Sequence, residues 1–127
     1  KVWQAAIELA VECYTVTGRF PKEEVYGLTS QIRRAATSIA ANIAEGHGRE
    51  LTGSFLQFLR ISQGSLKELE THMLIAQRIG LIGEHEFGQM AARCDEIGRM
   101  IRALIRSLQE SNETERNYSL FAIRYSL

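Results

Sequence analysis

The sequence has 127 residues, a formal net charge of zero and a hydrophobic fraction of 45%. This length is typical of one domain that buries a single core. No apolar run reaches the roughly 20 residues that a helix needs to cross a bilayer. We therefore expect no membrane partner, and the neutral charge argues against strong attraction of the whole surface to nucleic acid.

The two cysteines, Cys13 and Cys94, both fall within helical patterns. We expect reduced thiols in the core, because no disulfide framework is indicated. The amino-terminal residues show no signal-peptide pattern, so a cytoplasmic location is the default expectation.

The first predicted helix covers residues 2–17. Its polar positions Gln4, Glu8, Glu12 and Thr15 form one narrow strip, and nearly all other positions are apolar. A surface helix of a monomer usually has a wider polar face. Either the surplus apolar surface forms a contact between subunits, or the helix is deeply buried. The candidate interface residues are Val2, Trp3, Ala6, Ile7, Leu9 and Val16.

Gly18 ends the first helix, and residues 19–24 form a short connection in which Pro21 and the two glutamates after it suit a helix start. The second predicted helix then runs to about Glu45. Gly46-His47-Gly48 is expected to end it. Alanine and serine fill much of this helix beside a narrow aliphatic stripe, which predicts close approach of neighbouring backbones. Its two adjacent arginines, Arg33 and Arg34, point about 100° apart, so we predict that they do not serve one contact.

The third predicted helix runs from Thr52 to Gly80, and the fourth from Glu84 to about Gln109. Ser62 and Ser65 face inward on the third helix, where each hydroxyl can bond to the carbonyl four residues earlier. The fourth helix alternates apolar steps of three and four, which is a heptad seam. Because the loops are short, residues 1–109 are predicted to form an all-α, left-handed, antiparallel up-down-up-down four-helix bundle.

Residues 110–127 differ from the bundle. Residues 110–117 are polar and predict disorder. The tripeptide Tyr-Ser-Leu then recurs at a spacing of seven. The segment is either an amphipathic docking tail or a terminal stretch without a selected fold, and we expect it to be poorly ordered.

Signals of catalysis are weak. His47, His72 and His85 are the only histidines, and none belongs to a zinc-binding motif. No serine or cysteine pairs with a histidine at a spacing typical of a nucleophile. We therefore predict no catalytic residues, no metal ligands, no cofactor and no enzyme activity.

The basic residues include twelve arginines and only three lysines. Arg99, Arg102 and Arg106 lie within an arc of about 60° on the fourth helix. Arginine binds phosphate oxygens through a planar donor fork, so this stripe is the candidate nucleic-acid surface. Asp95 lies on the same arc and pairs well with Arg99, which leaves an ion-paired, solvated face as the alternative.

Several motifs together resemble a known family. They are Val2-Trp3-Gln4, Phe20-Pro-Lys-Glu-Glu24, Tyr26-Gly-Leu-Thr-Ser-Gln-Ile-Arg-Arg-Ala-Ala36, Ser38-Ile39, Ala41-Asn-Ile-Ala-Glu-Gly46 and Gly64-Ser-Leu-Lys-Glu-Leu-Glu70. Over residues 1–109 the chain is similar to the four-helix-bundle family of ribosomal RNA intervening-sequence proteins. The resemblance implies a ring-like homopentamer without enzyme activity.

One branch of that family, the accessory variability proteins of diversity-generating retroelements, partners a reverse transcriptase and binds nucleic acid through a basic barrel. This chain departs from that branch because it has no net positive charge. Two hypotheses follow. The first is an oligomer that associates with RNA or DNA through the arginine stripe, and the alternative is a protein-interaction scaffold without nucleic-acid binding.

Overall fold

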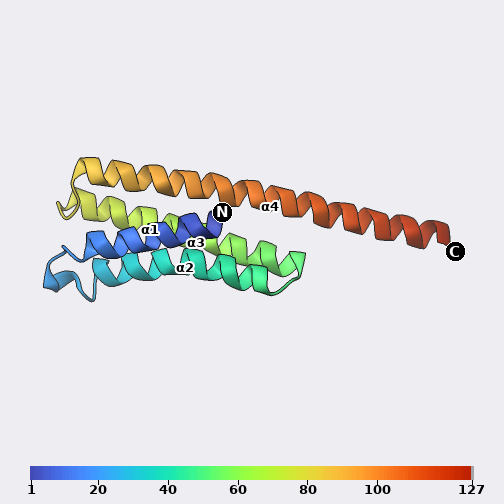
Figure 1. Cartoon of the computed structure of the whole chain (residues 1–127), viewed down its shortest axis with the longest axis horizontal. Coiled ribbons are helices and arrows are strands. Elements are labelled where there is room, and N and C mark those ends of the chain that lie inside the picture. The colour runs from blue at the N-terminus through green and yellow to red at the C-terminus, as the bar shows by residue number, and fades with distance from the viewer. Residues whose placement is uncertain (127) are drawn as a thin grey trace.

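The computed structural model describes the backbone of residues 1–126 and the side chains of residues 1–112. Within this part the chain forms four α-helices, with one short 3-10 helix, η1, before the second. Their bounds are α1 Val2–Thr17, η1 Lys22–Glu24, α2 Leu28–Gly48, α3 Thr52–Arg78 and α4 Glu84–Ser126. Successive helices run in opposite directions (Figure 1). The structure thus confirms the predicted all-α, antiparallel four-helix bundle.

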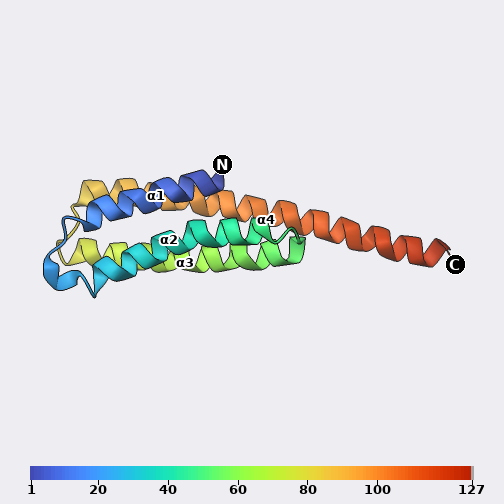
Figure 2. The ribbon, with the colours of Figure 1, turned by 60° about the horizontal axis from the view of Figure 1, so that its bottom comes forward.

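The four helices occupy the corners of a square. α1 packs against α2 and α4, and α3 also packs against α2 and α4, whereas the described backbones of α1 and α3 do not come close to each other. Figure 2 shows α2 beside α3, with α1 lying along α4. The α2–α3 pair has the most extensive packing and the α1–α4 pair the least. α1 and α3 therefore sit at diagonal corners, and their outer faces point away from each other.

The core consists of apolar residues from all four helices. On α4 it contains Met90, Cys94, Ile97, Ile101 and Ile105, which are spaced by four, three, four and four residues. This pattern is the predicted heptad seam. Burial of apolar area on this scale is the main force that holds such a bundle together.

Serine hydroxyls bridge the closely packed α2–α3 interface. Ser62 Oγ donates to the Ile39 carbonyl oxygen at 3.0 Å, and Ser38 Oγ and Ser65 Oγ share a hydrogen bond of 2.8 Å. Ser62 and Ser65 face inward, as predicted, but these hydrogen bonds run to α2 rather than to the preceding turn of α3. The backbones are close enough for a short side chain to reach across.

The start of α2 differs from the prediction. Pro21 precedes η1, and α2 begins at Leu28, after a non-helical residue at Gly27. The carboxylate of Glu24 accepts a hydrogen bond from the Leu28 amide at 3.2 Å. The acidic residues after Pro21 therefore form η1 and cap α2 instead of filling its first turn.

The end of α2 also differs, because the helix includes Gly46, His47 and Gly48. A Cβ atom on Gly46 would lie 2.7 Å from Phe58 Cβ and 3.1 Å from Phe55 Cδ1. Gly46 thus lets the first turns of α3 approach the helix backbone. The predicted helix stop is wrong at this residue, since the glycine serves a contact between helices.

α4 is longer than predicted. The expected end of this helix is near Gln109, whereas the structure continues it to Ser126. Residues 110–126 contain no glycine or proline, so no residue there breaks a helix that has already formed. The far end of α4 projects beyond the bundle (Figure 1). The sequence predicts a poorly ordered tail for residues 110–127. The side chains after residue 112 lie outside the described part of the chain.

Two ion pairs tie α4 to the first part of the chain. Arg93 Nη1 lies 3.0 Å from Glu12 Oε2 on α1, and Arg19 in the connection after α1 pairs with Glu86. Both pairs are partly exposed, so each contributes little to stability. Among the described residues, no helix is both long enough and apolar enough to span a membrane.

Candidate functional surfaces

The candidate interface residues on α1 divide between the core and the surface. Ala6, Leu9 and Val16 are buried inside the bundle, and Val2 is half-buried. The placement of Ala6, Leu9 and Val16 at a subunit interface is therefore wrong, because α2 and α4 cover them within one chain. Trp3 and Ile7 are exposed, so they stay candidates.

The exposed side of α1 carries an apolar stripe, which we define as Trp3, Ile7, Val11 and Tyr14. Their spacing of four, four and three places them on one face of the helix. Between 40% and 62% of each residue's surface is exposed. Isolated exposed apolar residues are normal, but an aligned row of four on one helix is a typical contact surface.

A second apolar surface lies on α3. We define this α3 patch as Leu74 and Ile75 on the helix together with Ile79, the residue directly after it; the three are 40–58% exposed. It sits near the carboxyl end of α3, before the turn at Gly80. Because α1 and α3 occupy diagonal corners, the α1 stripe and the α3 patch lie on different sides of the bundle.

The arginine stripe of α4 is exposed, as predicted, but its charge is partly neutralised. Arg99 Nη1 lies 3.6 Å from Asp95 Oδ2, which is the ion pair that the spacing indicated. Arg102 extends back over Gly98, and it borders a groove of about 380 Å³ that Asp95 and Glu70 also line. Arg102 and Arg106 form no ion pair with another described residue. Of the three arginines in the stripe, only Arg102 and Arg106 therefore have charges that no described residue neutralises.

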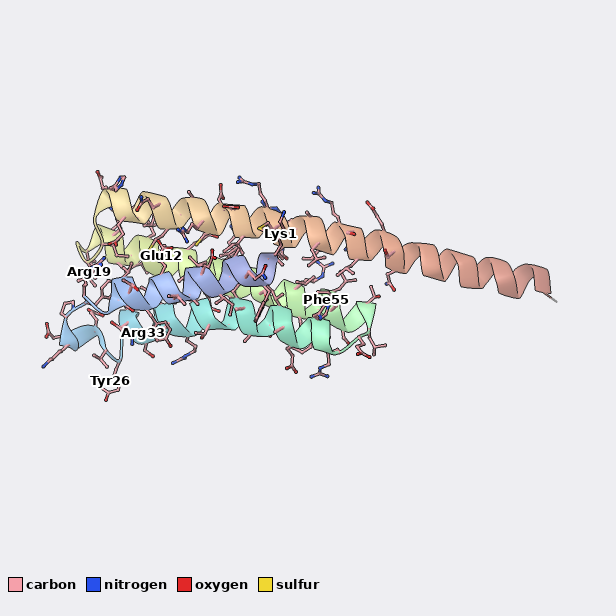
Figure 3. The ribbon with its side chains drawn as sticks, viewed as in Figure 1. Lys1, Glu12, Arg19, Tyr26, Arg33 and Phe55 are labelled. Atoms are coloured by element: carbon pink, nitrogen blue, oxygen red, sulfur yellow. The ribbon has the colours of Figure 1, made fainter. Side chains whose placement is uncertain are left out.

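Arg33 and Arg34 line the same pocket, although they point about 100° apart on the helix. Both line a pocket of about 540 Å³ between α1, the α1–α2 connection and the start of α2, together with Lys22. Figure 3 shows Arg33 near the end of the bundle that also carries Arg19 and Tyr26. Where the two side chains leave the helix backbone, their directions differ by about 100°. The connection folds back over α2, so two long side chains reach the same hollow.

Neither cysteine has the properties of a nucleophile. Cys13 and Cys94 are free and buried. Burial raises the pKa of each thiol to about 12, with a further contribution from nearby negative groups, so both stay protonated at neutral pH. Within the described part of the chain, no three His, Cys, Asp or Glu side chains gather in a way that could hold a metal ion.

The family model described as 23S rRNA-intervening sequence protein matches residues 1–103. The chain belongs to this family. The match covers α1, α2, α3 and the bundle portion of α4, and it ends before residues 110–127. The predicted resemblance is therefore confirmed for the bundle.

A solved structure shares the fold of this 23S rRNA-intervening sequence family member. It is a protein of unknown function from the S23 ribosomal protein family of Bacteroides thetaiotaomicron VPI-5482, with a TM-score of 0.74 and 23% sequence identity. The similarity covers 83% of this chain and 98% of that one. No functionally curated protein matches the chain. These similarities establish the bundle fold and indicate no enzyme family.

Proposed function

We propose that this family member is a non-enzymatic protein that assembles with copies of itself through the α1 stripe and acts as an interaction scaffold. The observation that carries this proposal is the exposed row Trp3, Ile7, Val11 and Tyr14. Burial of these four side chains against a partner would remove a large apolar surface from water.

The arrangement of the two apolar surfaces favours a head-to-tail assembly. The α1 stripe and the α3 patch lie on different sides of one bundle, so the stripe of one copy can pack on the patch of the next. Such heterologous contacts close into a ring when the rotation between copies permits it. The homopentamer implied by the family resemblance is one such ring.

Solution mass tests the assembly. Ile7→Glu with Val11→Glu places two charges in the proposed contact, and we expect this α1 variant to run as a monomer in light scattering at concentrations where the parent chain is larger. Gln4→Glu is the matched control, since it adds a charge to the polar side of the same helix. A parent chain that is monomeric at high concentration contradicts the proposal.

A mixing experiment tests the head-to-tail geometry. Ile75→Glu with Ile79→Glu makes an α3 variant whose α1 stripe is intact. In a head-to-tail assembly, the α1 variant and the α3 variant are each monomeric alone. Their mixture forms a heterodimer, because the intact α1 stripe of the α3 variant packs on the intact α3 patch of the α1 variant. If α1 stripes instead pair with each other, the α3 variant assembles alone and the mixture gains no heterodimer.

A second candidate function is association with RNA or DNA. Its specific support comes from Arg102 and Arg106, which are exposed and form no ion pair among the described residues. Repetition of these arginines around a ring would multiply the cations that a nucleic acid meets, although one chain is neutral overall. A reverse transcriptase partner, which belongs to another branch of the family resemblance, has no separate support from the described surfaces.

Fluorescence anisotropy with RNA and DNA oligonucleotides over a salt series tests this second function. Arg102→Glu with Arg106→Glu should abolish binding. Neutral substitutions should make the log–log salt slope shallower by about 0.7 for each single-strand phosphate that an arginine no longer neutralises. Arg60→Glu, on the exposed side of α3, is the control. Equal binding by all variants, or none by the parent at low salt, rules this candidate out.

A further inference from the structure

The pocket beside the start of α2 has the composition of an anion site. Lys22, Arg33 and Arg34 all line it, and none of its lining residues, each within the described part of the chain, is acidic. Its volume of about 540 Å³ lies within the range of small-molecule sites. Three cationic side chains that line one hollow without an acidic lining residue make it electropositive, which favours a bound anion.

The structure holds Arg33 in place. Arg33 Nε donates to Thr17 Oγ1 at 2.9 Å, and its guanidinium carbon lies 4.4 Å from the centre of the Tyr14 ring. Neither contact neutralises the charge of Arg33. The guanidinium is therefore fixed in position while its charge stays available to a ligand.

The first turn of α2 adds backbone donors to this pocket. The Leu28 amide is capped by Glu24, whereas the amides of Thr29 and Ser30 have no backbone acceptor among the described residues. Thr29 and Ser30 line the pocket. Free amides at a helix amino terminus, with the helix dipole behind them, bind phosphate and similar anions.

Thr29 supplies an independent indication of a ligand. It is only 7% exposed, and its Oγ1 is a buried polar atom without a hydrogen-bond partner in the described residues. An unsatisfied buried hydroxyl is costly and uncommon. Threonine in a helix has two accessible χ1 rotamers, so this hydroxyl can turn toward an anion in the pocket.

We propose that this pocket, bounded by Lys22, Thr29, Arg33 and Arg34, binds a small phosphate-bearing ligand. The donors surround one hollow instead of forming a track, which favours a compact anion over the backbone of a nucleic acid. Tyr14 and Phe20 also line the pocket and offer apolar contacts to the rest of such a ligand. Tyr14 belongs both to the α1 stripe and to the pocket lining. The Ile7→Glu, Val11→Glu variant leaves every pocket residue unchanged, so ligand binding is measured in that variant separately from self-assembly.

Calorimetric titration with inorganic pyrophosphate at low salt tests the site. We expect saturable binding by the parent chain, and a loss of affinity of about tenfold in Arg34→Gln, which removes charge-assisted hydrogen bonds from an exposed side chain. Arg60→Gln removes the same charge outside the pocket and should change the affinity by less than about twofold. Circular dichroism confirms that each variant keeps the parental helix content.

Three results would overturn the proposal: no saturable binding of pyrophosphate at millimolar concentration, an equal loss in Arg34→Gln and Arg60→Gln, or binding that needs a polymer. The last is tested with a short RNA oligonucleotide as competitor. If the RNA binds in an Arg34-dependent manner and pyrophosphate neither binds nor competes, the pocket belongs to a nucleic-acid surface. If pyrophosphate binds and displaces the RNA, the small-anion site is supported.

Discussion

At the scale of single residues, small side chains decide how closely α2 and α3 pack. Gly46 leaves room for Phe58 and Phe55, and Ser62 reaches the Ile39 carbonyl directly. Larger residues at these positions would push the helices apart. The packing of α2 against α3 is therefore sensitive to side-chain size at Gly46 and Ser62.

Gly46→Ala should destabilise the bundle by about 1–2 kcal/mol in urea unfolding, because overpacking at Phe58 outweighs the helix propensity of alanine. Gly64 on α3 is the matched control, since a Cβ there meets nothing within 4 Å. Gly64→Ala should stabilise the chain by about 0.5–1 kcal/mol. Stabilisation by both substitutions would show that Gly46 is not at a close contact.

At the scale of elements, the four helices are unequally supported. α2 and α3 share the most extensive contact and the serine bridges, whereas α1 shares less extensive contacts with α2 and α4 and leaves the α1 stripe exposed. An element that buries less of its surface opens at a lower free energy. α1 is therefore the helix that gains most from a partner.

Amide hydrogen exchange should show that α1 opens more easily than α2 and α3. In the monomeric Ile7→Glu, Val11→Glu variant, we expect the amides of α1 to exchange faster than those in the centres of α2 and α3. In the assembled parent chain, α1 should gain more protection than the other helices. Uniform exchange of all helices in the monomer would mean that the bundle opens only as a single unit.

At the scale of the whole molecule, the core contains two thiols that ionise only at high pH. Burial raises the pKa of Cys13 and Cys94 from an ordinary 9.0 to about 12. The folded chain thus keeps these protons at a pH at which the unfolded chain loses them. The resulting stability is fully present below pH 9 and is lost as the pH rises from 9 toward 12.

Urea unfolding between about pH 8 and pH 11 measures this effect. Above about pH 9 each thiol should contribute a loss of about 1.4 kcal/mol per pH unit. The Cys13→Ala, Cys94→Ala variant should be less stable at the lower pH but should show a shallower decline, since it lacks both buried thiols. An unchanged slope would show that the thiols ionise without unfolding.

The amino-acid sequence alone determined the elements that depend on periodicity. The bounds of α1, the heptad seam of α4 and the antiparallel order follow from apolar spacing and short loops, because these rules act within a few residues. The Arg99–Asp95 pair follows from the same local geometry. Where local rules compete, the prediction failed: Gly46 ends no helix, and the polar residues after Gln109 continue α4.

Only the tertiary structure decided which surfaces are available. Helix periodicity shows that α1 has too many apolar residues, but the positions of α2 and α4 determine that Leu9 is buried and Val11 is exposed. Likewise, the sequence separates Arg33 and Arg34 by their angle, and the folded α1–α2 connection brings both to one pocket with Lys22. The physical reason is the same in both cases. Whether a side chain is exposed, and which side chains line the same pocket, depends on contacts between residues distant in the chain. Local sequence patterns do not determine those contacts.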